Sequence, residues 1–284
     1  MLKKIFFAAA LLLASELGAK PVVIASIAPV EYLAKAVGGD KIEVQSLAKG
    51  DVHSYEPKPN DMKAVAKASL FIAAGLEFEE AWIPRFKASA KNLVVVKSDA
   101  KIAKLKEERG EQAEHDEKHE AHADPHVWLN PMLAITMARN ISDALIDMDK
   151  ANKDFYLENF QKLMNDLLAF DESAKNELAG LKNRKFVVYH PAWGYFAAHY
   201  DLEQISIERS GKEPKIDEMA STVKMIKDEN IKVIFADPNR SQKSAQILAS
   251  QTGAKVELLD PLGYNLLENL KIAVGAIKDA NSPK

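Results

Sequence analysis

Residues 154–181 read DFYLENFQKLMNDLLAFDESAKNELAGL and predict one long helix. Its apolar side chains recur in steps of three and four, which places them in a continuous stripe along a helix. They are Tyr156, Phe160, Leu163, Leu167, Phe170, Ala174 and Leu178. At ~1.5 Å per residue, about 25 residues span nearly 40 Å, which is longer than a usual globular helix. We interpret this mid-chain helix as a rigid linker between two lobes; the alternative is a core helix of one large domain.

Strand and helix patterns alternate on both sides of this helix. Short apolar runs rich in β-branched residues, typical of buried strands, occur at residues 21–27, 42–47, 70–74, 93–96, 186–189, 204–208, 232–236 and 255–259. Asn60 is predicted to cap the helix that follows it. The alternation predicts an α/β fold of two lobes, each a four-stranded, mostly parallel sheet flanked by helices. We assign an N-terminal lobe to residues 20–150, the linker helix to 151–182 and a C-terminal lobe to 183–284.

Residues 1–19 predict a secretory signal peptide. Lys3 and Lys4 precede a short apolar run, and the small residues Gly18 and Ala19 follow it, as at a cleavage site. The run is too short to cross a bilayer core of ~30 Å. The chain contains no cysteine, so we expect neither disulfides nor a lipid attached to cysteine. These features predict an exported, soluble protein of a bacterial periplasm without a lipid anchor.

Four of the seven histidines lie within residues 111–131, EQAEHDEKHEAHADPHVWLNP. Residues 111–124 are acidic and lack an apolar period, which predicts a loop. Its histidines, His115, His119 and His122, are either simply solvated or form an auxiliary metal-collecting site. In contrast, prolines flank His126, and the apolar residues that follow it can be buried. We therefore predict that His126 is a rigidly held metal ligand.

Other candidate ligands also follow predicted strands. His53 follows the second strand, His190 the fifth and Asp260 the eighth, and ligands of open α/β sheets bind beyond the carboxyl ends of strands. Together with His126 they would make a tetrahedral zinc site with distances of ~2.0–2.2 Å. The alternatives are hydrogen-bonded structural histidines and, for Asp260, a turn or a helix cap. His199 falls in a helix-like segment and is expected to be structural.

The composition argues against several function classes. The formal charge is −3, and no basic cluster with interleaved aromatic residues appears, so nucleic acid is not an expected partner. The sequence contains no HExxH, no GxSxG and no glycine-rich phosphate loop. A zinc enzyme also needs an open coordination position beside a base, which four protein ligands do not leave. We therefore predict a protein that is not an enzyme.

Four segments carry a family resemblance: HSYEPKPND at His53, DPHVWLNP at His126, YHPAWGYF at His190 and LLDPLG at Asp260. In these segments the chain resembles the metal-binding components of ABC importers for zinc and manganese, most closely the periplasmic high-affinity zinc uptake proteins. The similarity covers essentially the whole mature chain. It implies ligand roles for these four residues and two α/β lobes joined by one long helix. Manganese members carry glutamate at the third ligand, so His190 favours zinc.

The resemblance also implies a function. The chain would be a monomeric solute-binding protein that captures Zn²⁺ as its transported ligand. It would deliver the ion to the inner-membrane ABC permease of a zinc importer. The alternatives are a manganese- or iron-binding homologue of the same importer class and a metal-binding surface adhesin, since relatives of this fold have been described as adhesins.

Overall fold

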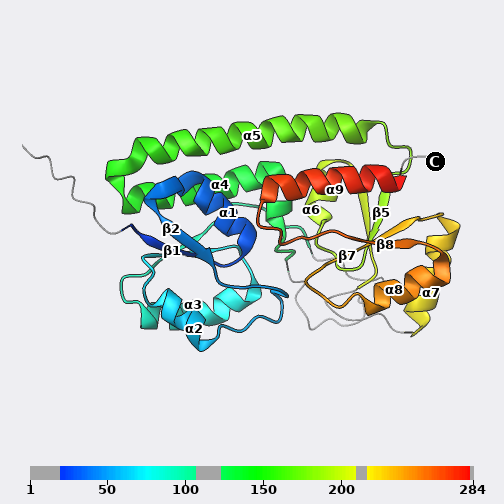
Figure 1. The fold of residues 1–284 in the computed structure, drawn as a ribbon, viewed down its shortest axis with the longest axis horizontal. Helices are drawn as coiled ribbons and strands as arrows, with labels where there is room; N and C mark the ends of the chain where they lie inside the picture. Colours follow the sequence, from blue (N-terminus) through cyan, green and yellow to red (C-terminus); the bar gives the residue numbers. More distant parts are fainter. Residues whose placement is uncertain (1–19, 107–122, 209–215, 282–284) are drawn as a thin grey trace, which may run out of the picture.

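The computed structural model describes residues 20–106, 123–208 and 216–281 of the chain. Two sheets lie side by side along the long axis of the molecule, and helix α5 (Lys153–Ala179) runs past both of them (Figure 1). Each sheet has four strands. This arrangement confirms the predicted fold class of two α/β lobes joined by one long helix.

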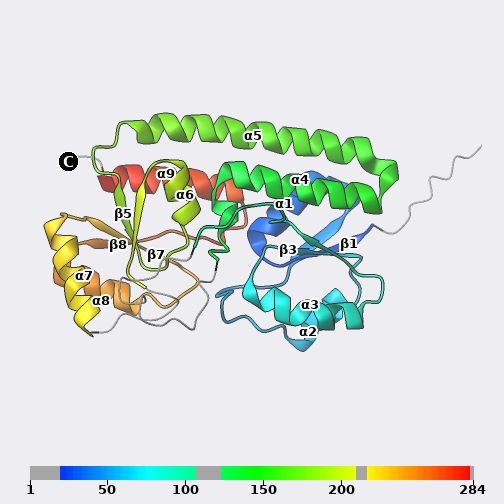
Figure 2. The same cartoon turned by 180° about the vertical axis from the view of Figure 1, so that it is seen from behind.

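The N-terminal sheet has the strand order β2-β1-β3-β4, and all neighbouring strands are parallel. Its strands are β1 (Val22–Ala25), β2 (Glu43–Ser46), β3 (Leu70–Ala73) and β4 (Val94–Lys97). Helices α1 (Ala28–Gly38) and α4 (Pro131–Met148) lie on one face, and α2 (Pro59–Val65) and α3 (Glu77–Ser89) on the other (Figures 1 and 2). Because helices cover both faces, β3, one of the two central strands, is buried along its whole length.

The C-terminal sheet repeats this topology with the order β6-β5-β7-β8, again wholly parallel. Its strands are β5 (Lys185–Val188), β6 (Glu203–Ser206), β7 (Val233–Ala236) and β8 (Lys255–Leu258). Its helices are α6 (Gly194–His199), α7 (Ile216–Asp228), α8 (Lys243–Thr252) and α9 (Leu266–Asn281). Within the described residues, short 3-10 turns lie at Gly39–Lys41, Val127–Leu129 and Lys150–Asn152.

Helix α5 packs against both lobes. All the apolar positions of its predicted stripe are buried. The helix packs against α1 and α4 of the first lobe and against α9 of the second. One hydrophobic core runs without a break from β1 and β3, past α5, to β5 and α9. The helix therefore links the lobes and also belongs to a core that both lobes share.

Trp128 adds a hydrogen bond between the two lobes. Its side chain is fully buried, and its Nε1 donates a hydrogen bond of 2.7 Å to the carbonyl oxygen of Pro261. Just beyond it, the Asn130 side chain caps α4 by accepting from the backbone N–H groups of Met132 and Leu133. The segment of residues 124–131 therefore supplies both a hydrogen bond between the lobes and the cap of helix α4.

One predicted helix cap is wrong. Helix α2 begins at Pro59, so Asn60 lies inside its first turn. Asp61 acts at this end instead, because its Oδ2 accepts from the Lys58 backbone N–H at 2.7 Å and from the Tyr55 hydroxyl at 2.8 Å. Because the fixed backbone angle of proline suits the first position of a helix, the helix begins at Pro59, one residue before Asn60. In the described parts of the chain, no helix has both the length and the apolar character needed to cross a membrane.

Candidate metal centre

Three histidines meet between the lobes, one from each of the loops that follow β2, β4 and β5. One ring nitrogen from each of His53, His126 and His190 lies within 4.8 Å of the other two. The Nε2 atoms of His53 and His190 are 3.2 Å apart. His126 and His190 are buried, whereas His53 is exposed. Solvent therefore reaches this group of imidazoles from the side of His53.

The ring of His126 is held by a neighbouring carboxylate. Its Nδ1 lies 2.7 Å from Oδ1 of Asp124, and its backbone N–H donates to the same oxygen at 2.9 Å. A carboxylate at this distance places the proton of a neutral imidazole on Nδ1 and leaves the lone pair of Nε2 for a metal. The indole ring of Trp128 packs against the imidazole, with 5.3 Å between ring centroids.

His190 has two charged neighbours at its Nδ1. Oε2 of the buried Glu208 lies 2.9 Å away, and Nη1 of Arg240 also lies 2.9 Å away. The second guanidinium nitrogen of Arg240, Nη2, donates to Oε1 of Glu208 at 2.7 Å. Glu208 follows β6 and Arg240 follows β7, so both come from the carboxyl end of the sheet that carries His190.

Burial and the neighbouring charges disfavour protonation of His53 and His190. Burial of the ring, followed by repulsion from His126 and His190, lowers the pKa of His53 to about 3, although part of the residue faces solvent. Burial lowers the pKa of His190 well below its usual value, and His126 and Arg240 act in the same direction. Both rings are therefore neutral at pH 7, which is the form that binds metal ions.

Asp260 does not belong to the group of three histidines. Its Oδ1 accepts from the Asn239 side-chain amide at 2.7 Å and from the Leu262 backbone N–H at 2.8 Å. These bonds stabilise the turn after β8, which is the alternative that the sequence left open for this residue. Its role as a metal ligand stays a prediction.

His115, His119 and His122 of the predicted collecting loop lie outside the described residues, as does the predicted signal peptide of residues 1–19. His199 lies apart from the centre and has a structural contact, because its Nε2 is 2.6 Å from Oδ1 of Asp171 in α5.

The two chain segments that flank residues 107–122 are fastened together next to the histidines. Lys106 and Ala123 form an antiparallel bridge, and the Asp124 backbone N–H donates to the Leu105 carbonyl at 2.9 Å. The Tyr195 hydroxyl accepts from the Leu105 N–H and donates to the Asp124 carbonyl, both at 2.8 Å. A cavity of about 110 Å³ adjoins this junction, and its lining includes the side chains of His126 and His190.

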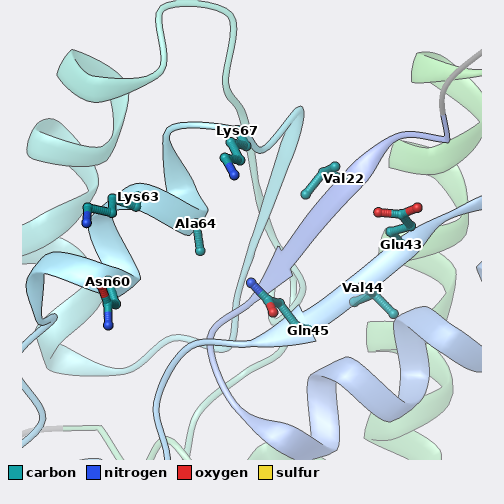
Figure 3. Close-up of a pocket in the computed structure, with 8 residues that line it drawn as sticks. All are labelled: Val22, Glu43, Val44, Gln45, Asn60, Lys63, Ala64 and Lys67. Carbon is teal, nitrogen blue, oxygen red and sulfur yellow. The ribbon is translucent and has the colours of Figure 1, made fainter.

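A larger surface pocket, of about 410 Å³, is unrelated to the histidines. It lies between helix α2 and the edge strand β2 (Figure 3). Its lining consists of Val22, Glu43, Val44, Gln45, Asn60, Lys63, Ala64 and Lys67. This lining contains no histidine and only one carboxylate, so the smaller space between the lobes is the better candidate for a metal centre.

Asp124, Glu208 and Arg240 support the centre but were not predicted from the sequence. Glu208 and Arg240 stand just beyond strands β6 and β7. Ligands of open α/β sheets bind beyond the carboxyl ends of the strands. The same rule that predicted the histidines therefore also identifies Glu208 and Arg240. Asp124 could have been found from its place two residues before a ligand candidate, where its carboxylate can reach the ring.

Two α/β lobes with parallel sheets, a shared core and three imidazoles gathered between them fit one class of protein, the metal-binding components of ABC importers. The profile of the family described as zinc-uptake complex component A, periplasmic (ZnuA), matches residues 23–280. The chain belongs to this family. Because the family consists of transport components, its membership agrees with the prediction that this protein is not an enzyme.

Known proteins extend this likeness over nearly the whole chain. The high-affinity zinc uptake system protein ZnuA of Bacillus subtilis is 30% identical over 284 residues, covering 93% of this chain and 88% of that protein. A ZnuA deletion mutant with zinc bound has a TM-score of 0.86 at 34% identity, covering 93% of this chain and 99% of its own. The laminin-binding protein of Streptococcus agalactiae, described as having adhesin and metal transporting activity, has a TM-score of 0.81 at 27% identity, with 93% and 100% covered.

Proposed function

We propose that this chain is a periplasmic solute-binding protein that captures Zn²⁺ at His53, His126 and His190 and delivers it to an ABC permease in the inner membrane. The observation that carries the proposal is the convergence of three imidazoles from both lobes, with one ring nitrogen of each within 4.8 Å of the others. The match to a zinc-uptake family over residues 23–280 supports it.

The ligand chemistry favours zinc over harder cations. Imidazole nitrogens bind Zn²⁺ at ~2.0–2.1 Å in tetrahedral sites, whereas calcium and magnesium prefer oxygen ligands. Nitrogen sites also bind zinc more tightly than manganese. Asp124 and Glu208 lie behind His126 and His190, where such carboxylates orient the ring and raise its basicity.

Asp260 is our candidate for the fourth ligand, and a water molecule is the alternative. Both hydrogen bonds described for its carboxylate use Oδ1, so Oδ2 is the oxygen that it would offer to a metal. An Asp260→Ala variant distinguishes a carboxylate ligand from a water ligand. A loss of zinc affinity of about 100-fold or more supports a ligand, because changes behind the ligands alone cost ~10–100-fold. An unchanged affinity assigns the position to water.

Metal analysis and zinc titration against a competing chelator test the proposal directly. The purified protein should bind zinc tightly at one site, and His190→Ala should weaken binding by more than about 100-fold, beyond the effect of losing a supporting residue. His199→Ala is the matched control, because that histidine pairs with Asp171 outside the centre. Equal behaviour of the two variants would refute the site.

Competition experiments address the remaining possibilities. If manganese or iron displaces zinc at equal concentration, the result would favour a manganese- or iron-binding component of the same importer class. Surface adhesion is the second candidate function, because the similar laminin-binding protein has both activities. Laminin binding by the purified chain would support it. Zinc-limited growth of a strain whose own copy carries His190→Ala tests delivery to the permease, and normal growth would count against it.

A further inference from the structure

The hydroxyl of Tyr195 joins the two lobes beside the histidines. Tyr195 is the second residue of α6 in the C-terminal lobe and is only 4% exposed. Its hydroxyl accepts from the Leu105 backbone N–H and donates to the Asp124 carbonyl oxygen, both at 2.8 Å. A backbone N–H can only donate and a carbonyl oxygen can only accept, so the direction of both bonds is fixed. One hydroxyl therefore connects two segments of the N-terminal lobe to the C-terminal lobe.

Asp124 relays this contact to the ring of His126. Its Oδ1 lies 2.7 Å from Nδ1 of His126 and accepts from the backbone N–H of the same residue at 2.9 Å. The other carboxylate oxygen lies close to α6, because a Cβ added at Gly194 would stand 3.2 Å from Oδ2. The carbonyl that Tyr195 holds and the carboxylate that holds the imidazole belong to one residue. A shift of the Asp124 backbone would therefore move the ring.

Tyr195 contacts the chain on both sides of His126. Asp124 lies two residues before this histidine, and Asn130 lies four residues after it. The Asn130 side-chain amide makes a longer hydrogen bond, of 3.5 Å, to the Tyr195 carbonyl oxygen. Tyr195 also lies only five residues after His190, in the same lobe. A short path of direct contacts therefore connects one histidine from each lobe, and it does not pass through a metal ion.

We propose that Tyr195 is a positioning residue for metal capture, which holds His126 in place relative to His190 before the ion arrives. The inference rests on the proposed metal-binding role of these histidines. A site whose ligands already stand in position loses less conformational freedom on binding and therefore binds more tightly. Tyr195→Phe keeps the buried ring and removes only the oxygen that makes both bonds. In this variant the segment before His126 gains freedom that metal binding must then remove.

Hydrogen exchange of single amides tests the contact in the full chain without metal. In Tyr195→Phe the Leu105 N–H loses its acceptor, so its exchange followed by NMR should be about tenfold faster than in the wild type. The amides of β3, in the middle of the N-terminal sheet, should exchange as before. An unchanged rate at Leu105 would overturn the proposal. Equally faster exchange in β3 would also overturn it, because the variant would then have loosened the whole lobe.

Zinc titration against a competing chelator tests the consequence for capture. Tyr195→Phe should weaken zinc binding by about tenfold, at the lower end of the range for residues behind metal ligands. Tyr156→Phe is the matched control, because that tyrosine is also buried and its hydroxyl donates to Asp149 at 2.8 Å, near the start of α5. Its zinc affinity should equal that of the wild type. Equal losses in the two variants would contradict a specific role for Tyr195.

A double-mutant cycle gives a readout that a purely structural role would not reproduce. If Tyr195 acts through Asp124, adding Tyr195→Phe to Asp124→Ala should cost about twofold or less in zinc affinity, because coupled residues are not additive. A further loss of about tenfold would overturn the proposal. A wild-type protein that binds no zinc would instead refute the proposed function, and the exchange rate of the Leu105 amide would still decide whether Tyr195 holds these segments.

Discussion

Two adjacent leucines of helix α5 offer a direct test of its packing. Leu167 is fully buried, whereas Leu168 is 41% exposed. Leu167→Ala removes apolar atoms from the closed core and should cost about 2–5 kcal/mol of unfolding free energy. Leu168→Ala has the same change in helix propensity but loses little packing, and its cost should stay within about 0.5 kcal/mol. Comparing the two variants therefore separates the effect of lost burial from the effect of the substitution on the helix itself.

Urea unfolding of the zinc-free protein, followed by circular dichroism, measures this difference. With a slope of about 3 kcal/mol/M for a protein of this size, a loss of ~3 kcal/mol lowers the midpoint by about 1 M for Leu167→Ala. Leu168→Ala should shift the midpoint by less than about 0.2 M on the same slope. Because one core runs through both lobes, we expect one transition. Equal shifts in the two variants, or separate transitions for the lobes, would refute the reasoning.

Three further predictions concern the metal centre and the lobes. Asp124→Ala should lower zinc affinity by ~10–100-fold in a chelator titration, because the ring of His126 loses its carboxylate; full affinity would show that the carboxylate does not matter. The zinc-free protein should lose unfolding free energy as pH falls from 6.5 toward 3. In that range the unfolded chain takes up protons at His53 and His190 and the folded chain, with its lowered pKa values, does not; urea midpoints that do not change with pH would contradict this. Zinc should change the radius of gyration in solution scattering by less than about 1 Å, because pre-organised structures move little on binding and the lobes share a core and the Trp128 hydrogen bond; a large compaction would contradict a rigid linker.

The sequence predicts the fold well because the periodic signals are strong. The apolar stripe of α5 is buried at every predicted position, and both sheets form as predicted. Periodicity identifies the face that is buried but not what covers it. The continuation of the core from one lobe into the other could therefore not be predicted.

The histidines were predicted from their places after strands, and the structure brings three of them together. The supporting contacts depend on how far side chains reach and in which direction. The bonds of Asp260 to Asn239 and Leu262 depend on the orientation of one carboxylate in a turn, which residue spacing does not specify. The contact of Arg240 with Glu208 joins two different loops, and neither loop alone suggests it.

The bridge between Lys106 and Ala123 has an evolutionary consequence. Residues paired in an antiparallel bridge lie only ~5 Å apart, so the polypeptide departs and returns through almost the same point on the surface. An insertion or deletion between them leaves Asp124 and His126 in place. The length and composition of residues 107–122 can therefore vary in evolution without changing the histidine cluster between the lobes.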